Sequence, residues 1–268
     1  MGIRTDLAVE RRASLTRKDL PGLTHRETHQ GAALVTELTV ESREASEALR
    51  KPVGRYVTVD LPEGWHREEP LRAQAASLLT GYLSPLLPEG PALVVGLGNR
   101  DVTPDALGPR TADLVTVTRC LRKELRGSAR AVACLAPGVM GQTGMEPLEL
   151  LRAVCGAVKP AFVIAVDALA ARSLSRLGRS FQLTDAGIVP GEGAGSRRFA
   201  LSQKTLGVPV FTLGVPTVTE ASTLARDLTG SDAALPKGSF LVSPGEIDLL
   251  VQRSAAVLAE VLDRTLLS

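Results

Sequence analysis

The sequence predicts an α/β fold with three layers, in which a mostly parallel, twisted sheet is flanked by helices. From residue 92 onward, short apolar runs alternate with helical patterns, which indicates βαβ units. Aromatic residues make up only 3% of the 268 residues, so the core must consist mainly of Val, Leu, Ile and Ala. That is the usual filling of a parallel sheet with helices on both faces.

The first ninety residues mix strand and helix signals. Apolar and β-branched residues over Ala33–Val40 and Tyr56–Leu61 predict two strands. Apolar residues at helical spacing predict a helix over Pro70–Leu83, which ends at a Pro-rich segment.

The later elements follow in chain order. Buried strands are expected over Ala92–Leu97, Ala131–Leu135, Phe162–Val166 and Val208–Leu213. Helices are expected over Pro104–Leu121, Glu146–Val158 and Pro244–Leu267. In such sheets chemistry gathers at the carboxyl ends of the strands, where residues 96–105, 136–144 and 167–169 are expected to lie.

Composition narrows the class of protein. The 31 basic and 29 acidic residues give a net charge of +2, which argues against a global electrostatic hold on nucleic acid. The sequence contains no apolar run of membrane-spanning length, and residues 1–10 lack the apolar core of a signal peptide. These features predict a cytoplasmic protein. The cysteines Cys120, Cys134 and Cys155 lie in apolar surroundings without metal-binding spacing and are expected to be buried thiols.

Motifs for nucleotides, metals and nucleophiles are incomplete. The third glycine of a dinucleotide fingerprint beginning at Gly96 would fall on Asp101, and the sequence has no P-loop and no GxSxG elbow. His25 and His29 are four residues apart, but the acid between them is misplaced for a zinc protease. That polar segment predicts a solvated loop or helix face. With His66 as the only other histidine, a His-rich metal cluster near the sheet is not expected.

Two carboxylates remain at predicted strand ends. Asp167 follows the apolar strand Phe162–Val166, where desolvation is expected to raise its pKa. Asp105 lies just inside the helix predicted after another strand, Ala92–Leu97, and the N-terminus of that helix favours the charged form of the carboxyl group. Carboxylates with pKa values pushed apart suit acid–base catalysis. On spacing alone, the simpler interpretation is still a helix-start residue and a loop-capping residue.

Several long motifs resemble those of the spore germination protease family, from about Ile3 to the last helix. They comprise residues 95–99, 102–109, 136–144, 163–170, 205–210 and 214–218, including Val102-Thr-Pro-Asp-Ala-Leu-Gly-Pro109 and Val163-Ile-Ala-Val-Asp-Ala-Leu-Ala170. The resemblance places the two implicated aspartates of the family on Asp105 and Asp167. It implies an endopeptidase that degrades small acid-soluble, DNA-binding spore proteins, cutting after an acidic and before an apolar residue.

The resemblance also implies a zymogen. Arg4-Thr-Asp-Leu-Ala-Val-Glu10 resembles both the processing site and the substrate motif of the family, with cleavage between Asp6 and Leu7. Residues 1–6 would then be a propeptide and residues 7–268 a single α/β peptidase domain. The family further implies a homotetramer in the forespore or spore core. No cofactor is expected, and the small net charge and the lack of a membrane-spanning run predict no direct contact with nucleic acid or membrane.

Further site residues follow from the same hypothesis. Glycine-rich turns present N–H groups, so the amides of Gly141, Gln142, Thr143 and Gly144 are candidates to hold substrate and steady an oxyanion. Arg197, Arg198 and Lys204 are candidates to meet acidic substrate residues, although a solvated basic face explains them as well. The alternative function is that of a metal-dependent hydrogenase-maturation-type protease, to which the sequence has a more distant likeness. That enzyme class uses a histidine for which this sequence has no counterpart, so the aspartates are expected to activate water without a bound metal.

Overall fold

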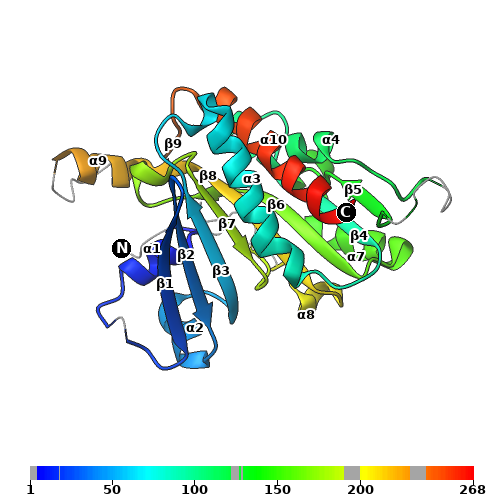
Figure 1. Ribbon diagram of the computed structural model, residues 1–268, viewed down its shortest axis with the longest axis horizontal. Helices are drawn as coiled ribbons and strands as arrows, with labels where there is room; N and C mark the ends of the chain where they lie inside the picture. The colour runs from blue at the N-terminus through cyan, green and yellow to red at the C-terminus, as the bar shows by residue number, and fades with distance from the viewer. Residues whose placement is uncertain (1–4, 18, 122–126, 128, 190–199, 230–239) are drawn as a thin grey trace.

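The computed structural model describes residues 5–17, 19–121, 127, 129–189, 200–229 and 240–268. Eight of its strands form one sheet in the order β1-β2-β3-β7-β8-β6-β4-β5, and the short strand β9, Leu241–Val242, pairs with the end of β8 (Figure 1). The sheet has helices on both faces, so the predicted α/β class is confirmed.

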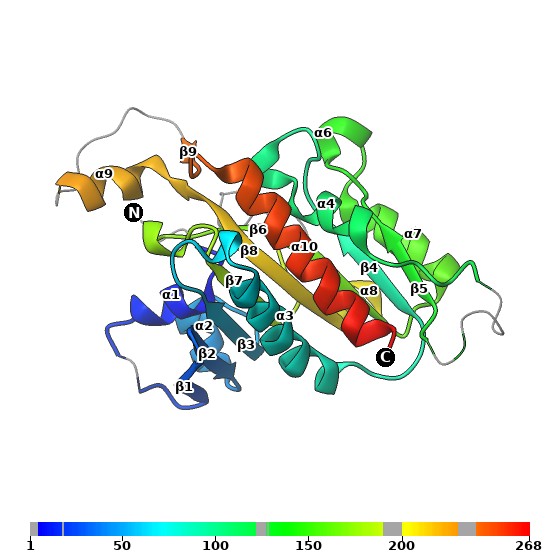
Figure 2. The same cartoon turned by 45° about the horizontal axis from the view of Figure 1, so that its top comes forward.

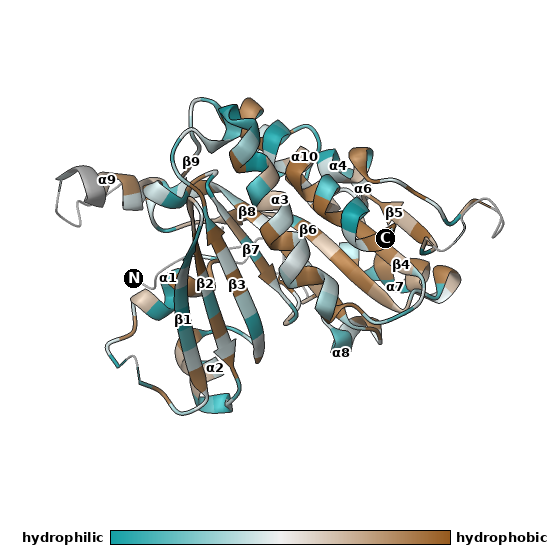
Figure 3. Cartoon of the chain, in the orientation of Figure 1, coloured by the Kyte–Doolittle hydropathy of each residue, from teal (hydrophilic) through white to brown (hydrophobic). Residues whose placement is uncertain are grey.

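One half of the sheet is parallel. It contains β4 (Ala92–Gly96), β5 (Val132–Leu135), β6 (Phe162–Ala170) and β8 (Val210–Glu220). The strands β4, β5 and β6 are nearly continuous apolar runs, as buried parallel strands are, whereas β8 mixes apolar residues with Thr; the apolar residues are brown in Figure 3. Each of the four predicted strands of this half therefore exists.

The other half is antiparallel, so the sheet is mixed and the prediction of a mostly parallel sheet is wrong. It contains β1 (Leu23–Gln30), β2 (Ala33–Val40), β3 (Gly54–Asp60) and β7 (Ser180–Thr184). The strand β7 runs antiparallel to both β3 and β8, so it joins the two halves. Gly31 with φ of 60° allows the tight turn between β1 and β2.

Helices cover the two faces of the sheet. On one face α3 (Glu69–Leu83), α4 (Leu107–Leu114) and α10 (Ile247–Leu266) pack on a core that includes Ile164 and Val166 of β6. On the other face α7 (Pro147–Val158) packs on Val163 and Ala165. Figures 1 and 2 show α3 and α10 lying side by side across the strands.

Short elements complete the chain. The helices α1 (Ala8–Ala13) and α2 (Arg43–Leu49) pack together beside the antiparallel half. The others are α6 (Met140–Thr143), α8 (Gln203–Leu206), α9 (Ala221–Thr229) and 3-10 turns at Trp65–Arg67, Ser84–Leu86, Thr103–Asp105 and Leu174–Arg176. Among the described helices, none combines the length and the apolar character needed to cross a bilayer.

Three local predictions are wrong. The segment with His25 and His29 is the edge strand β1, because its residues pair along their whole length with β2. The helix expected over Pro104–Leu121 is a 3-10 turn followed by α4, which ends at Leu114. Beyond it the chain is held by other partners, since Thr116 donates its N–H to Asp263. Cys120 consequently lies on an exposed turn, and Cys134 and Cys155 are only partly buried.

Candidate active site

Asp167 lies within β6, near its carboxyl end, and is only 3% exposed. Side chains alternate along a strand, so Asp167 shares the face of Val163 and Ala165, the face that α7 covers. The carboxylate accepts the N–H of Ala168 at 2.9 Å. A buried carboxylate on an otherwise apolar strand has no role in packing the core, which marks it as a functional candidate.

Asp105 ends the 3-10 turn that follows β4, and its side chain is half-buried. Its Oδ2 accepts the main-chain N–H of Asn99 at 2.8 Å. Gly98 makes this turn possible: its φ is 114°, and a Cβ there would lie 2.0 Å from the carbonyl oxygen of Asp105.

The backbone brings the two aspartates to one edge of the sheet. The N–H of Leu97 donates to the carbonyl of Val166 at 2.8 Å, which joins the end of β4 to the residue before Asp167. The turn containing Asp105 packs on Gly98, directly after Leu97. It also lies against β6 and β8. The expectation that the two strand-end segments meet is therefore confirmed at the level of the backbone.

The segment 139–145 lies beside the Asp105 turn. The side-chain amide of Gln142 donates to Oδ1 of Asn99 at 2.7 Å and to Oδ2 of Asp101 at 2.9 Å. The main-chain amides of Gln142 and Thr143 bond to the carbonyl of Val139. That of Gly144 bonds to the carbonyl of Met140. These amides close the short helix α6, so the freely presented N–H groups expected at residues 142–144 are not found.

The predicted processing site, Asp6–Leu7, is docked on the same sheet. Asp6 is 7% exposed and Leu7 is fully buried. The N–H of Asp6 donates to the carbonyl of Ala170 at 2.9 Å, and the N–H of Ala170 donates back to Oδ2 of Asp6 at 2.8 Å. The segment therefore binds to the end of β6, three residues beyond Asp167.

Gln182 on β7 forms hydrogen bonds to the backbone on both sides of the Asp6–Leu7 bond. Its Nε2 donates to the carbonyl of Asp6 at 3.2 Å, and its Oε1 accepts the N–H of Ala8 at 2.8 Å. Gln182 and Asp167 are both in register with Gly214 of β8, one from each side, so their side chains share one face of the sheet. No sequence motif marked Gln182.

Glu10 anchors the far end of this segment. It is 6% exposed and accepts the main-chain N–H groups of Arg172 at 2.7 Å and Ser173 at 2.8 Å. Arg176 lies 3.9 Å away, and the hydroxyl of Thr5 donates a short hydrogen bond to the same carboxylate. Hydrogen bonds of Asp6, Ala8 and Glu10 thus hold residues 5–10 of the predicted processing motif against the sheet.

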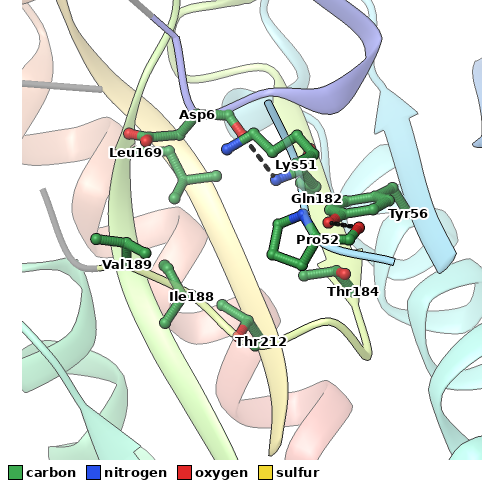
Figure 4. A pocket seen from close by; sticks show the side chains of 11 residues that line it. Asp6, Lys51, Pro52, Tyr56, Leu169, Gln182, Thr184, Ile188, Val189 and Thr212 are labelled. Atoms are coloured by element: carbon green, nitrogen blue, oxygen red, sulfur yellow. Dashed lines mark hydrogen bonds between the residues drawn. The ribbon is translucent and has the colours of Figure 1, made fainter. Parts of the chain in front are cut away.

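A small pocket that opens to solvent lies next to Asp6 (Figure 4). Besides Asp6, its lining includes Lys51, Leu169, Gln182 and Thr212. Lys51 is 8% exposed and follows α2, and sequence reasoning gave no sign of it. It reaches the pocket because β3 pairs with β7, which places the α2–β3 connection beside the residues of β7 that line the pocket.

Other candidate residues lie elsewhere. Lys204 is exposed on α8, whereas Arg197 and Arg198 lie outside the described residues. Burial raises the pKa of the Cys134 thiol to about 11, which makes it a poor nucleophile at neutral pH. Within the described part of the chain, no three His, Cys, Asp or Glu side chains are grouped as a metal site would require.

Carboxylates at the carboxyl ends of parallel strands are typical of α/β proteins that carry out acid–base chemistry on a bound ligand. Comparison with known proteins gives the particular family. A family model described as "Germination protease" matches residues 4–230. The chain therefore belongs to the germination protease family, as its motifs indicated, and is a peptidase of spore germination.

Individual relatives agree with this assignment. The chain is 40% identical to the germination protease of Clostridium tetani over 237 residues, which cover 85% of this chain and 73% of the relative. It is 38% identical to that of Bacillus subtilis over 241 residues, with 84% and 65% covered. A solved hydrogenase maturation protease from Thermococcus kodakarensis covers 69% of this chain and 99% of its own, at 18% identity and a TM-score of 0.39. A similarity this low has no bearing on mechanism.

Proposed function

We propose that this peptidase hydrolyses its substrate with a water molecule held between Asp105 and Asp167. One carboxylate takes a proton from the water molecule as the water oxygen attacks the peptide carbonyl carbon. The other delivers a proton to the leaving amine as the carbon–nitrogen bond breaks. The observation that carries the proposal is the burial of Asp167 at the edge where the Asp105 turn meets β6.

We further propose that the chain is a zymogen that cuts itself between Asp6 and Leu7, which makes residues 1–6 a propeptide. Its proposed substrates are the small acid-soluble spore proteins, cut after an acidic and before an apolar residue. The docked segment supports this, because Asp6 and Leu7 present that pair of residue types next to β6. We also propose that the protein forms a homotetramer, and native mass spectrometry tests this oligomeric state. Its proposed location is the spore core.

The test is peptide cleavage by the full chain. Wild type, Asp105→Asn and Asp167→Asn are incubated with Thr-Asp-Leu-Ala-Val-Glu, and mass spectrometry follows the peptide and the N-terminus of the protein. Asp248→Asn is the matched control, because Asp248 is an exposed aspartate on α10, outside the segment that carries Asp105. We expect cleavage after Asp in wild type and control, and a loss of at least about a hundredfold in the other two. Equal rates in all four proteins would refute the dyad.

A metal-dependent mechanism of the hydrogenase-maturation type predicts a different pattern. Chelators would abolish cleavage by wild type, and added nickel or zinc would restore it. We expect activity to survive chelation, because the acid–base steps assigned to the two aspartates require no Lewis acid.

A further inference from the structure

The pocket beside Asp6 contains an acidic and a basic side chain in a largely buried setting. Among the described residues that line it, Asp6 is the only acid and Lys51 the only base. Lys51 is 8% exposed, so its charge is kept in a region where water screens poorly. Figure 4 shows Lys51 and Gln182 on one side of the pocket, with Asp6 above them.

We propose that this pocket, together with the position of Asp6 at its edge, is the subsite for the acidic residue of the substrate, and that Asp6 holds this position in the unprocessed chain. Three groups would recognise the incoming residue. The N–H of Ala170 would bind its carboxylate, as it now binds Oδ2 of Asp6 at 2.8 Å. Gln182 would bind its carbonyl oxygen, as it now binds that of Asp6. Lys51 supplies the positive charge. This inference rests on the proposed self-processing function.

The charge balance of the pocket favours an anionic occupant. Among the described lining residues, release of residues 1–6 removes the acidic side chain of Asp6 and leaves the basic side chain of Lys51 in place. A buried cation that loses a nearby anion carries a desolvation cost, which a new carboxylate offsets. A neutral residue of the same shape, such as Asn, offers no such gain.

A second observation points to a ligand. The hydroxyl of Thr212 lines the pocket and is buried, yet its Oγ1 has no hydrogen-bond partner among the described residues. A buried hydroxyl without a partner costs about 1–3 kcal/mol, so such groups usually serve a bound molecule or water. Thr212 neighbours Gly214 on β8, on the sheet face that Asp167 and Gln182 share.

The main experiment compares two peptides, Thr-Asp-Leu-Ala-Val-Glu and Thr-Asn-Leu-Ala-Val-Glu. The full chain is allowed to process itself, and the ratio of kcat/KM for the two peptides is measured in wild type, Lys51→Met, Lys51→Arg and Lys204→Met. We expect Lys51→Met to reduce the preference for Asp by about tenfold or more, and Lys51→Arg to retain most of it. An unchanged ratio in Lys51→Met, or a loss in Lys204→Met instead, overturns the subsite.

Thr212→Val covers the case in which Lys51→Met does not fold. It replaces an unpartnered hydroxyl by a methyl group of equal size, so stability is expected to be unchanged or higher. We expect kcat/KM for the Asp peptide to fall several-fold nonetheless, because Thr212 would reach the substrate carboxylate through a water molecule held in the pocket. An unchanged kcat/KM would count against the pocket.

A measurement without turnover separates this inference from the proposed function. In an Asp167→Asn background, urea unfolding is followed for Asp6→Asn, Lys51→Met and the double variant. Recognition of the carboxylate by Lys51 predicts a midpoint shift in the double variant that is smaller than the sum of the single shifts. Strictly additive shifts overturn it. If wild type cuts neither peptide, the proposed function fails, and this cycle alone decides the subsite.

Discussion

The side-chain amide of Gln142 donates a 2.7 Å hydrogen bond to Oδ1 of Asn99, the residue whose main-chain N–H binds the carboxylate of Asp105. Two segments from different parts of the chain thereby fix one carboxylate. Gln142 therefore helps to position Asp105 through its side chain. Its main-chain N–H, which the sequence suggested for an oxyanion, binds the carbonyl of Val139 instead.

Gln142→Ala is expected to lower kcat several-fold, because the Asp105 turn loses the hydrogen bond from Gln142 to Asn99 that holds it in place. KM is expected to change little, since no substrate contact is removed. Steady-state kinetics on the peptide Thr-Asp-Leu-Ala-Val-Glu measures both, with Gln203→Ala on the exposed surface of α8 as the control. A rise in KM at constant kcat would instead assign Gln142 to substrate binding.

Gln182→Glu is expected to slow cleavage between Asp6 and Leu7. The carboxylate still accepts the N–H of Ala8, but it cannot donate to the carbonyl of Asp6. The two oxygens then repel each other in a buried site, at a cost of about 1–3 kcal/mol. Intact-mass spectrometry over time measures the conversion, and processing at the wild-type rate would contradict the assignment.

Gly108→Ala is expected to destabilise the protein and displace the Asp105 turn. A Cβ at Gly108 would lie 2.2 Å from the carbonyl oxygen of Leu97 and 2.5 Å from that of Val166, both of them backbone atoms. Relief of such a clash typically costs about 1–3 kcal/mol. Gly156→Ala is the control: it lies inside α7 with open space around it and is expected to stabilise by up to about 1 kcal/mol. Urea unfolding compares the two variants.

The three thiols are expected to react at different rates. The thiolate is the reactive form, and burial raises the pKa of Cys134 to about 11, so at pH 8 only about one part in a thousand of it is thiolate. Burial also raises the pKa of Cys155. Cys120 is exposed and is expected to be alkylated first by iodoacetamide. Peptide mapping gives the order, and faster labelling of Cys134 would contradict it.

The sequence predicted the parallel half of the sheet well, because Ala92–Gly96 and Phe162–Ala170 are apolar runs with one environment on both faces. It did not reveal β1 or β7. The residues of β1 are mostly polar, as an edge strand permits, and β7 is short with polar residues on one face. Both segments become strands because they pair with other strands of the sheet, and the local pattern of apolar residues does not reveal such pairing.

The same limit applies to the site. Asp105 and Asp167 could be put forward as candidates from the sequence because each lies shortly after a recognisable apolar run. Lys51 and Gln182 could not, because they reach the Asp6 segment only through the antiparallel pairing of β3 with β7 and of β7 with β8. Their positions depend on long-range register, and nothing in the neighbouring residues distinguishes them.

The place of β8 in the sheet has a consequence for biosynthesis. Val210–Glu220 is among the last strands to leave the ribosome, yet it lies between β7 and β6 and separates Gln182 from Ala170. Both anchors of Asp6 reach their final spacing only after β8 has inserted. A nascent chain that stops short of residue 220 therefore lacks the strand that sets the spacing of these two anchors, so they come together only late in translation.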